Sequence, residues 1–122
     1  MRTTLERPRV LSASTLQGDK VENLAGEDLG KIEDFMIDLA TGQIAYCVLS
    51  FGGFLGIGNK LFAVPWSALS LDLKDHAFIL NVNKEQLKNA PGFDKNKWPD
   101  MTDREWGATI YGFYKITPYW EE

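Results

Sequence analysis

Between residues 20 and 82 the chain alternates short apolar runs with turn residues, a pattern typical of a domain built from short β-strands. Gln43–Phe51 is apolar at both alternating sets of positions, which predicts a central strand covered on both faces. Leu61–Val64 is a second apolar run, and it ends at a proline, which cannot donate a ladder hydrogen bond. Alternating apolar positions on either side of Asp75–His76 predict a β-hairpin with one buried face.

The segment Lys31–Ala40 permits two interpretations. Its apolar residues fall at positions i, i+3, i+4 and i+7, which favours an amphipathic helix. A strand requires a bulge near Glu33–Asp34. Such a bulge would bring three apolar side chains to one face: Ile32, Phe35 and Ile37. Local periodicity favours the helix slightly.

Two helices are expected after these strands. Asn83 and Gln86 have the spacing of a capping box, and their helix should stop before Pro91. Thr102 and Glu105 repeat the capping signature ahead of a second helix. The apolar residues of this second helix share one face: Trp106, Ile110, Phe113 and Tyr114. Many short strands with one or two short C-terminal helices predict a mainly β, α+β domain, a small barrel of about six strands.

The aromatic residues concentrate at the C-terminus, where the last thirty residues hold eight of the fifteen. This arm can pack on its own barrel or against a second subunit, because interface cores favour aromatic side chains. Stacking on nucleic-acid bases would need interleaved basic residues, which the arm lacks. Tyr119 and Trp120 lie beyond Pro118, which we expect to end the second helix, and need another surface to cover them. We therefore expect a homodimer to which these two residues contribute.

Charge argues against a nucleic-acid partner. Thirteen basic and seventeen acidic residues give a net charge of −4, whereas nucleic-acid binders usually carry a basic patch. The three arginines within residues 1–9 form the only basic cluster, and we interpret that segment as a flexible tail. No apolar stretch approaches the ~20 residues that a membrane span needs, and no secretory signal pattern is visible. We expect a soluble, cytoplasmic protein.

A glycine-rich loop at residues 51–60 offers the first candidate chemistry. Gly53 and Gly58 have the spacing of a phosphate-binding loop, but Asn59 stands where the lysine is required. We interpret the segment as a flexible connection between strands. Its exposed apolar residues are a candidate partner-binding site: Phe54, Leu55 and Ile57.

No other side chains form a recognisable reactive centre. His76 is the only histidine and sits in an expected turn without a nucleophile that can be placed beside it. Cys47 lies inside the central strand, where a buried, inert thiol is expected. Asp34 and Asp38 are expected to border turns and accept backbone hydrogen bonds. We expect no catalytic residue, no metal site and no cofactor.

Several segments together resemble the PRC-barrel family: Leu29–Asp34, Asp38–Ile44, Val64–Leu69 and, for its stand-alone bacterial branch, Leu87–Phe93. That family includes the cytoplasmic domain of the photosynthetic reaction-centre H subunit and the C-terminal half of a ribosome-maturation factor. The resemblance implies a strand rather than a helix at residues 30–39, and it carries no shared catalytic residues.

We divide the chain into three parts: a flexible tail at residues 1–9, a PRC-barrel domain at 10–93, which the resemblance covers, and the aromatic arm at 94–122. The resemblance implies a non-catalytic adaptor, and together with the expected homodimer it predicts a domain that self-associates and binds an unidentified protein partner. Two alternatives stay open: an RNA-associated accessory of ribosome assembly, and a small-ligand binding protein that uses the glycine-rich loop.

Overall fold

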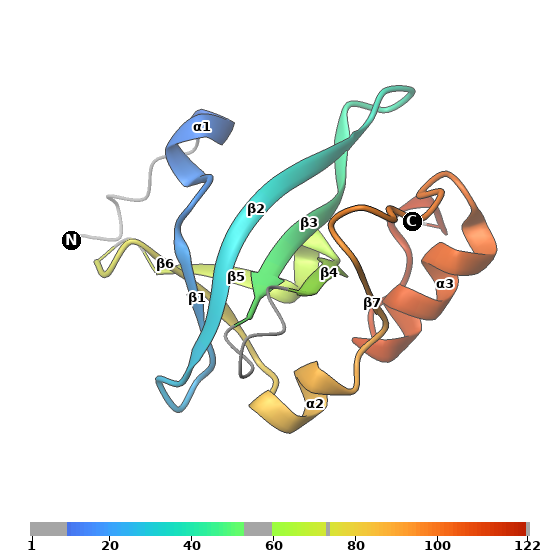
Figure 1. Ribbon diagram of the computed structural model, residues 1–122. Coiled ribbons are helices and arrows are strands. Elements are labelled where there is room, and N and C mark those ends of the chain that lie inside the picture. The colour runs from blue at the N-terminus through green and yellow to red at the C-terminus, as the bar shows by residue number, and fades with distance from the viewer. Residues whose placement is uncertain (1–9, 53–59, 73, 122) are drawn as a thin grey trace.

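Seven strands form one curved sheet in the computed structural model, which describes residues 10–52, 60–72 and 74–121 (Figure 1). The strand order is β5-β6-β1-β2-β3-β4-β7, and among the described residues no pairing joins β5 to β7. The chain is therefore mainly β with short helices, as predicted, and its barrel-like sheet stays open. The strands are β1 (Lys20–Glu22), β2 (Asp28–Asp38), β3 (Gln43–Phe51), β4 (Lys60–Val64), β5 (Leu69–Asp72), β6 (Ala77–Leu80) and β7 (Gly92–Phe93). The helices are α1 (Ala13–Leu16), α2 (Lys84–Lys88) and α3 (Arg104–Phe113), with 3-10 turns η2 (Trp66–Ala68) and η3 (Tyr119–Glu121).

Strand β3 is the centre of the sheet. It pairs antiparallel with β2 on one side and with β4 on the other. Every residue from 45 to 51 is buried, as expected for a strand that is covered on both faces. The prediction for this segment is confirmed, including both ends.

The segment at residues 31–40 is mostly strand β2, so the helix that its periodicity favours is wrong. The register of β2 against β3 shifts between Ile32 and Asp34 and again between Met36 and Ile37. These irregularities shift the alternation of side chains, so apolar positions fall at helical spacing in an extended strand. Hydrogen bonds to β1 and β3 outweigh the local pattern. The alternative interpretation, a strand bulged near Glu33, is confirmed.

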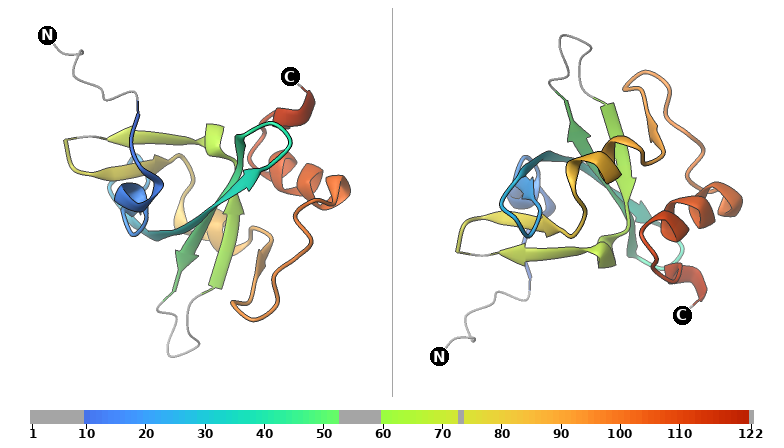
Figure 2. Two further views of the ribbon diagram at one scale, coloured as in Figure 1. Left: turned by 90° about the horizontal axis from the view of Figure 1, so that it is seen from above. Right: turned by 90° about the horizontal axis from the view of Figure 1, so that it is seen from below.

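Two apolar cores lie on opposite sides of β3 and β4. Figure 2 shows α3 and the C-terminal end of the chain on one side of these two strands, and β1, β5 and β6 on the other. The larger core fills the concave side of the sheet and includes Leu49, Phe62, Phe78 and, from α2, Leu87. The smaller core joins the outer side of β3 and β4 to the C-terminal arm. The second core extends the fold beyond the barrel.

The hairpin and the first helix match the sequence prediction. β5 and β6 pair antiparallel, and α2 starts in a capping box. Asn83 accepts a hydrogen bond from the amide of Gln86, and the Gln86 side chain accepts one from the amide of Asn83, each at 2.8 Å.

Helix α3 starts and ends differently from the prediction. Its N-cap is Asp103, not Thr102, because the Asp103 carboxylate accepts the amide hydrogen of Glu105 at 2.9 Å. The Thr102 hydroxyl instead donates to Asp100 at 2.5 Å. The helix ends at Phe113, well before Pro118, because Lys115 adopts a left-handed backbone (φ +58°).

Candidate functional site

An apolar groove of about 360 Å³ opens between the N-terminal segment and the sheet. Four of its lining residues come from the segment around α1: Val10, Leu11, Ala13 and Leu16. Five come from the sheet and the turn η2: Phe35, Ile37, Ile44, Trp66 and Leu71. All nine side chains are apolar. Such a groove has no group for acid–base or metal chemistry, but it can take apolar side chains from a partner.

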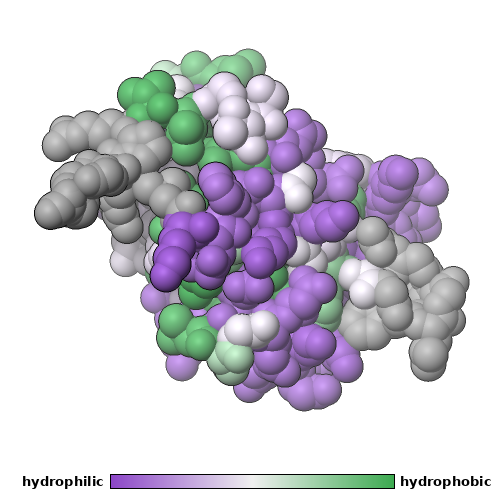
Figure 3. Space-filling view, turned by 90° about the vertical axis from the view of Figure 1, so that its left-hand side faces the viewer, coloured by the Kyte–Doolittle hydropathy of each residue, from purple (hydrophilic) through white to green (hydrophobic). Residues whose placement is uncertain are grey.

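The groove keeps large apolar side chains in contact with water. Val10 is 87% exposed, Ile37 47%, Leu11 40% and Trp66 38%. Figure 3 shows the side of the molecule that carries α1: most of it is hydrophilic, and hydrophobic residues gather along its upper edge. Contiguous exposed apolar surface of this kind marks interaction sites in soluble proteins.

Helix α1 is fixed over the sheet by polar contacts. Its N-cap, Ser12, accepts the amide hydrogen of Thr15 at 3.2 Å. The Gln17 side chain donates to the carbonyl oxygen of Glu33 in β2 at 2.8 Å, and the Gly18 amide donates to the carbonyl of Ile32 at 2.8 Å. These bonds hold the N-terminal wall of the groove against β2.

Trp66 forms the opposite wall. The residue is only partly buried, because 38% of it is exposed. One side of the ring makes edge contacts with Phe35 and Phe78, with centroids 6.2 and 6.1 Å away. Pro65 ends β4, and the following 3-10 turn carries the indole to the rim. Trp66 is thus anchored in the core while it presents a free edge.

The C-terminal arm packs on its own domain. Tyr111, which the predicted helix face omits, is buried and donates a hydrogen bond to the carbonyl of Ala45 at 2.6 Å. The Trp120 ring contacts Tyr111 with centroids 5.5 Å apart, and the Arg104 guanidinium lies 4.5 Å from the Trp120 ring. The premise that Trp120 and its neighbour need a foreign surface is therefore wrong.

A polar contact fixes the end of the arm to the β2–β3 hairpin. The Tyr119 hydroxyl donates to Asp38 at 2.5 Å. Burial raises the pKa of Tyr119 to about 12, and the bond to Asp38 adds to that shift. The same bond, with the Ala40 amide, lowers the pKa of Asp38. The homodimer expected through Tyr119 and Trp120 stays a prediction.

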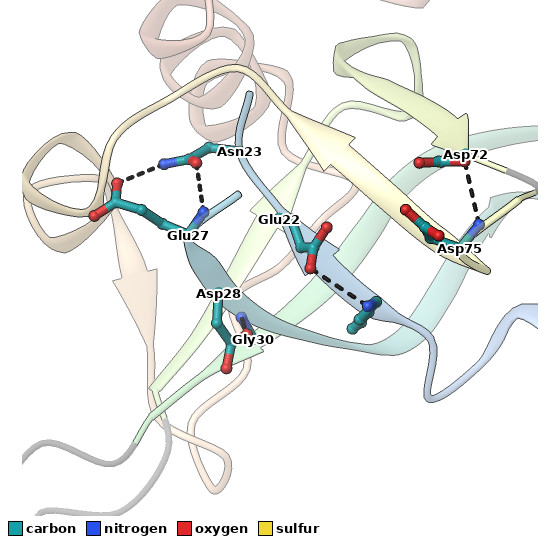
Figure 4. A network of polar contacts seen from close by, with 8 residues as sticks. Glu22, Asn23, Glu27, Asp28, Gly30, Asp72 and Asp75 are labelled. Atoms are coloured by element: carbon teal, nitrogen blue, oxygen red, sulfur yellow. Dashed lines mark hydrogen bonds and ion pairs between the residues drawn. The ribbon is translucent and has the colours of Figure 1, made fainter. Parts of the chain in front are cut away.

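Most other carboxylates near the sheet serve turns. Asp34 accepts the amide hydrogen of Phe35, and Asp38 accepts that of Ala40, as expected. Only Asp38 borders a turn, because Asp34 lies inside β2. Figure 4 shows polar side chains with the same role around β1. The Asn23 side-chain amide donates a hydrogen bond to the Glu27 carboxylate, and the Asp28 carboxylate accepts the amide hydrogen of Gly30. Within residues 10–52, 60–72 and 74–121, no three His, Cys, Asp or Glu side chains group as metal ligands would.

The remaining sequence candidates do not meet at a common centre. Burial raises the pKa of the Cys47 thiol to about 12, so it stays protonated near neutral pH. His76 is exposed in the β5–β6 turn. The loop residues Phe54, Leu55 and Ile57 lie outside the described part of the chain. No helix among the described residues is long and apolar enough to cross a membrane.

The comparisons with known proteins bear on the family. No curated protein matches the chain. Among solved structures, the chain is similar to a putative 16S ribosomal RNA processing protein, RimM, from Pseudomonas aeruginosa, with 18% identity and a TM-score of 0.42. That similarity covers 69% of this chain and 50% of the other, so the chain spans about half the length of that protein. The sequence model of the PRC-barrel domain matches residues 8–87, more than half of the 122 residues. The chain therefore belongs to the PRC-barrel domain family.

Proposed function

We propose that this protein is a non-catalytic interaction domain and that a protein partner docks in its apolar groove. One observation carries the proposal: large apolar side chains from separate parts of the chain meet at one surface and remain exposed there. Trp66 and Ile37 are the central members of this set.

The energetics favour a partner that covers these side chains. Apolar surface removed from water contributes roughly 25 cal/mol per Å². Interface cores are enriched in aromatic side chains such as Trp66, and a central aromatic anchor often dominates binding energy. A partner that contacts both Trp66 and Ile37 would bury the exposed edge of each.

Self-association is the second part of the proposal. Tyr119 and Trp120 are half-buried against their own domain, so each ring retains an accessible side. A two-fold contact would place the same patch of two copies face to face. This contact would lie at the C-terminal arm, so it can be tested separately from the groove.

The docking site can be tested with a photo-crosslinking amino acid placed in the full chain in its native cell. We expect a discrete crosslinked product from position 37, at the rim of the groove. Leu24 provides the matched control, because it is also apolar and is 74% exposed, but it lies in the β1–β2 turn outside the groove. Equal products from positions 37 and 24, or a product from 24 alone, would contradict the proposed site.

A further inference from the structure

We infer that a cavity beside the tip of the β2–β3 hairpin binds a small, neutral, mostly apolar molecule whose carbonyl oxygen accepts hydrogen bonds from Tyr46 and Arg104. The cavity lies where this tip meets the start of α3 and the turn η3, and Figure 2 shows these three segments side by side. The inference does not depend on the docking groove proposed above, although Ile37 lines both.

The cavity has the size and the lining of a small-molecule site. Its volume is about 390 Å³, within the range of ligand pockets in proteins. Most of its wall is apolar and comes from three separate parts of the chain: Met36, Ile37 and Leu39 near the hairpin tip, Met101 before α3, and Trp120 in η3. An apolar molecule that enters the cavity removes this surface from water, which favours binding.

Tyr46 contributes a hydroxyl that has no partner. The residue is only 1% exposed, and its ring packs against Trp106 and Tyr111, with centroids 5.2 and 5.6 Å away. Within the described residues the hydroxyl makes no hydrogen bond, and it remains partly accessible at the cavity. Burial raises the pKa of Tyr46 to about 12, so the hydroxyl stays protonated near neutral pH. A ligand that supplies an acceptor would satisfy this donor.

Arg104 places a second donor at the cavity. Its guanidinium lies 4.5 Å from the centroid of the Trp120 ring, and it forms no ion pair within the described part of the chain. Its charge lowers the pKa of Tyr46 and of Tyr119 against the larger effect of burial, so the guanidinium lies near both hydroxyls. The indole covers one face of the guanidinium and leaves N–H groups at its edge free to donate.

The charges at the cavity favour a neutral ligand. Asp38 and Asp103 also line it, so an anion would meet two carboxylates. A cation would meet Arg104, and each oxygen of Asp38 already accepts a hydrogen bond. A neutral carbonyl oxygen can accept from both Tyr46 and Arg104 without either repulsion.

The test compares three probes that share a phenyl ring: acetophenone, a neutral ketone; benzoate, an anion; and benzylammonium, a cation. Each is titrated into the full chain with isotope-labelled methionine methyl groups, because Met36 and Met101 both line the cavity. We expect acetophenone to shift both signals with a Kd on the order of 1 mM, as suits so small a ligand. Benzoate and benzylammonium should each bind at least about threefold more weakly.

Three variants assign the binding to named groups. Tyr46→Phe keeps the ring and removes the unpartnered hydroxyl, so it should weaken acetophenone about three- to tenfold without lowering Tm. Tyr111→Phe is the matched control: it removes a hydroxyl that donates to the Ala45 carbonyl, so it should lower Tm and leave acetophenone binding unchanged. Arg104→Gln should strengthen benzylammonium, because the cation no longer meets a positive charge.

Four outcomes would overturn the inference. They are the absence of shifts at Met36 and Met101 with every probe, equal affinities for the three probes, full affinity of acetophenone for Tyr46→Phe, and loss of the shifts as the chain self-associates. The last would mean that a second copy covers the cavity. The docking groove is tested by a different result, a protein crosslink specific to position 37, so the two proposals can fail separately.

Discussion

Two glycines of helix α3 differ in their surroundings although they lie only five residues apart. A Cβ atom on Gly107 would lie 2.4 Å from the Tyr46 hydroxyl and 2.7 Å from the Trp120 ring, whereas one on Gly112 would meet nothing within 4 Å. The absent side chain at Gly107 is what lets the helix and Trp120 close over Tyr46. The helix backbone therefore approaches the barrel closely at Gly107.

The pair gives a matched test. Gly107→Ala should lower the free energy of unfolding by about 1–3 kcal/mol, because the buried Tyr46 ring and the half-buried Trp120 ring must move. Gly112→Ala should raise it by about 0.4–1 kcal/mol, because alanine restricts the unfolded chain. Urea unfolding measures both. Equal effects of the two substitutions would show that the arm does not pack closely at Gly107.

The bond between Tyr119 and Asp38 should depend on pH. Folding lowers the pKa of Asp38 below its ordinary value of 3.8, so the ionised carboxylate stabilises the fold at pH values above 3.8. This contribution is lost as the pH falls through the lowered pKa. Tyr119→Phe should therefore destabilise the protein near neutral pH, and its difference from the wild type should shrink below about pH 4. Unfolding in urea across this range measures the difference.

Tyr111→Phe is the control for that titration. Its hydroxyl donates to the backbone carbonyl of Ala45, and neither group titrates in acid. The cost of Tyr111→Phe should stay constant over the same range. The same acid dependence for both variants would contradict a specific role for Asp38.

At the scale of secondary-structure elements, β2 depends on a glycine where it approaches β3. Gly30 has φ +114°, and a Cβ there would lie 2.1 Å from the carbonyl oxygen of Ser50. Gly30→Ala should lower the free energy of unfolding by at least about 2 kcal/mol, since both the backbone angle and the strand contact are disturbed. Gly26→Ala, with φ +83° and no neighbour within 4 Å, should cost only about 1–2 kcal/mol. Similar losses in thermal unfolding would contradict the close approach.

The elements that local patterns predicted well are those whose signals are themselves local. Gln43–Phe51 is apolar on both faces, and a central strand has that composition wherever it lies. The capping box at Asn83 uses two side chains three residues apart. By contrast, the bulges of β2 arise from pairing with β3, and local periodicity alone pointed to a helix. The resemblance to the family corrected that error.

The arm shows the same division between local and long-range information. Its helix was predicted, but Tyr111 was missed because its environment depends on β3, 66 residues away along the chain. The early end of α3 depends on a left-handed backbone at Lys115, a conformation that is uncommon for lysine and that the sequence does not predict.

At the scale of the whole molecule, the groove exists only after the chain has folded. Its lining combines residues near positions 10, 35 and 70, which no sequence motif connects. A trace of it is visible beforehand: Ile37 is an apolar residue near the tip of a hairpin, where turns are usually polar, and it is 47% exposed. Trp66 could not be recognised in this way, because a tryptophan after a core strand is expected to be buried, whereas Trp66 is 38% exposed.

The oligomeric state can be separated from packing of the arm. Deleting Thr117–Glu122 removes Tyr119 and Trp120 and uncovers Tyr111, so Tm should fall at every protein concentration. If these residues also form a homodimer, Tm of the full chain should rise with concentration, and the deletion should abolish that rise. Light scattering checks the mass. A full-length monomer at about 50 µM would contradict the homodimer.

The central claim is that a protein partner occupies the apolar groove, and methyl NMR of the full chain tests it most directly. The partner segment identified by crosslinking is added to protein labelled at Ile and Leu methyl groups. Signals from Leu11, Ile37, Ile44 and Leu71 should shift, while those of Leu24 and the buried Ile110 should not. Shifts confined to residues outside the groove would contradict the claim.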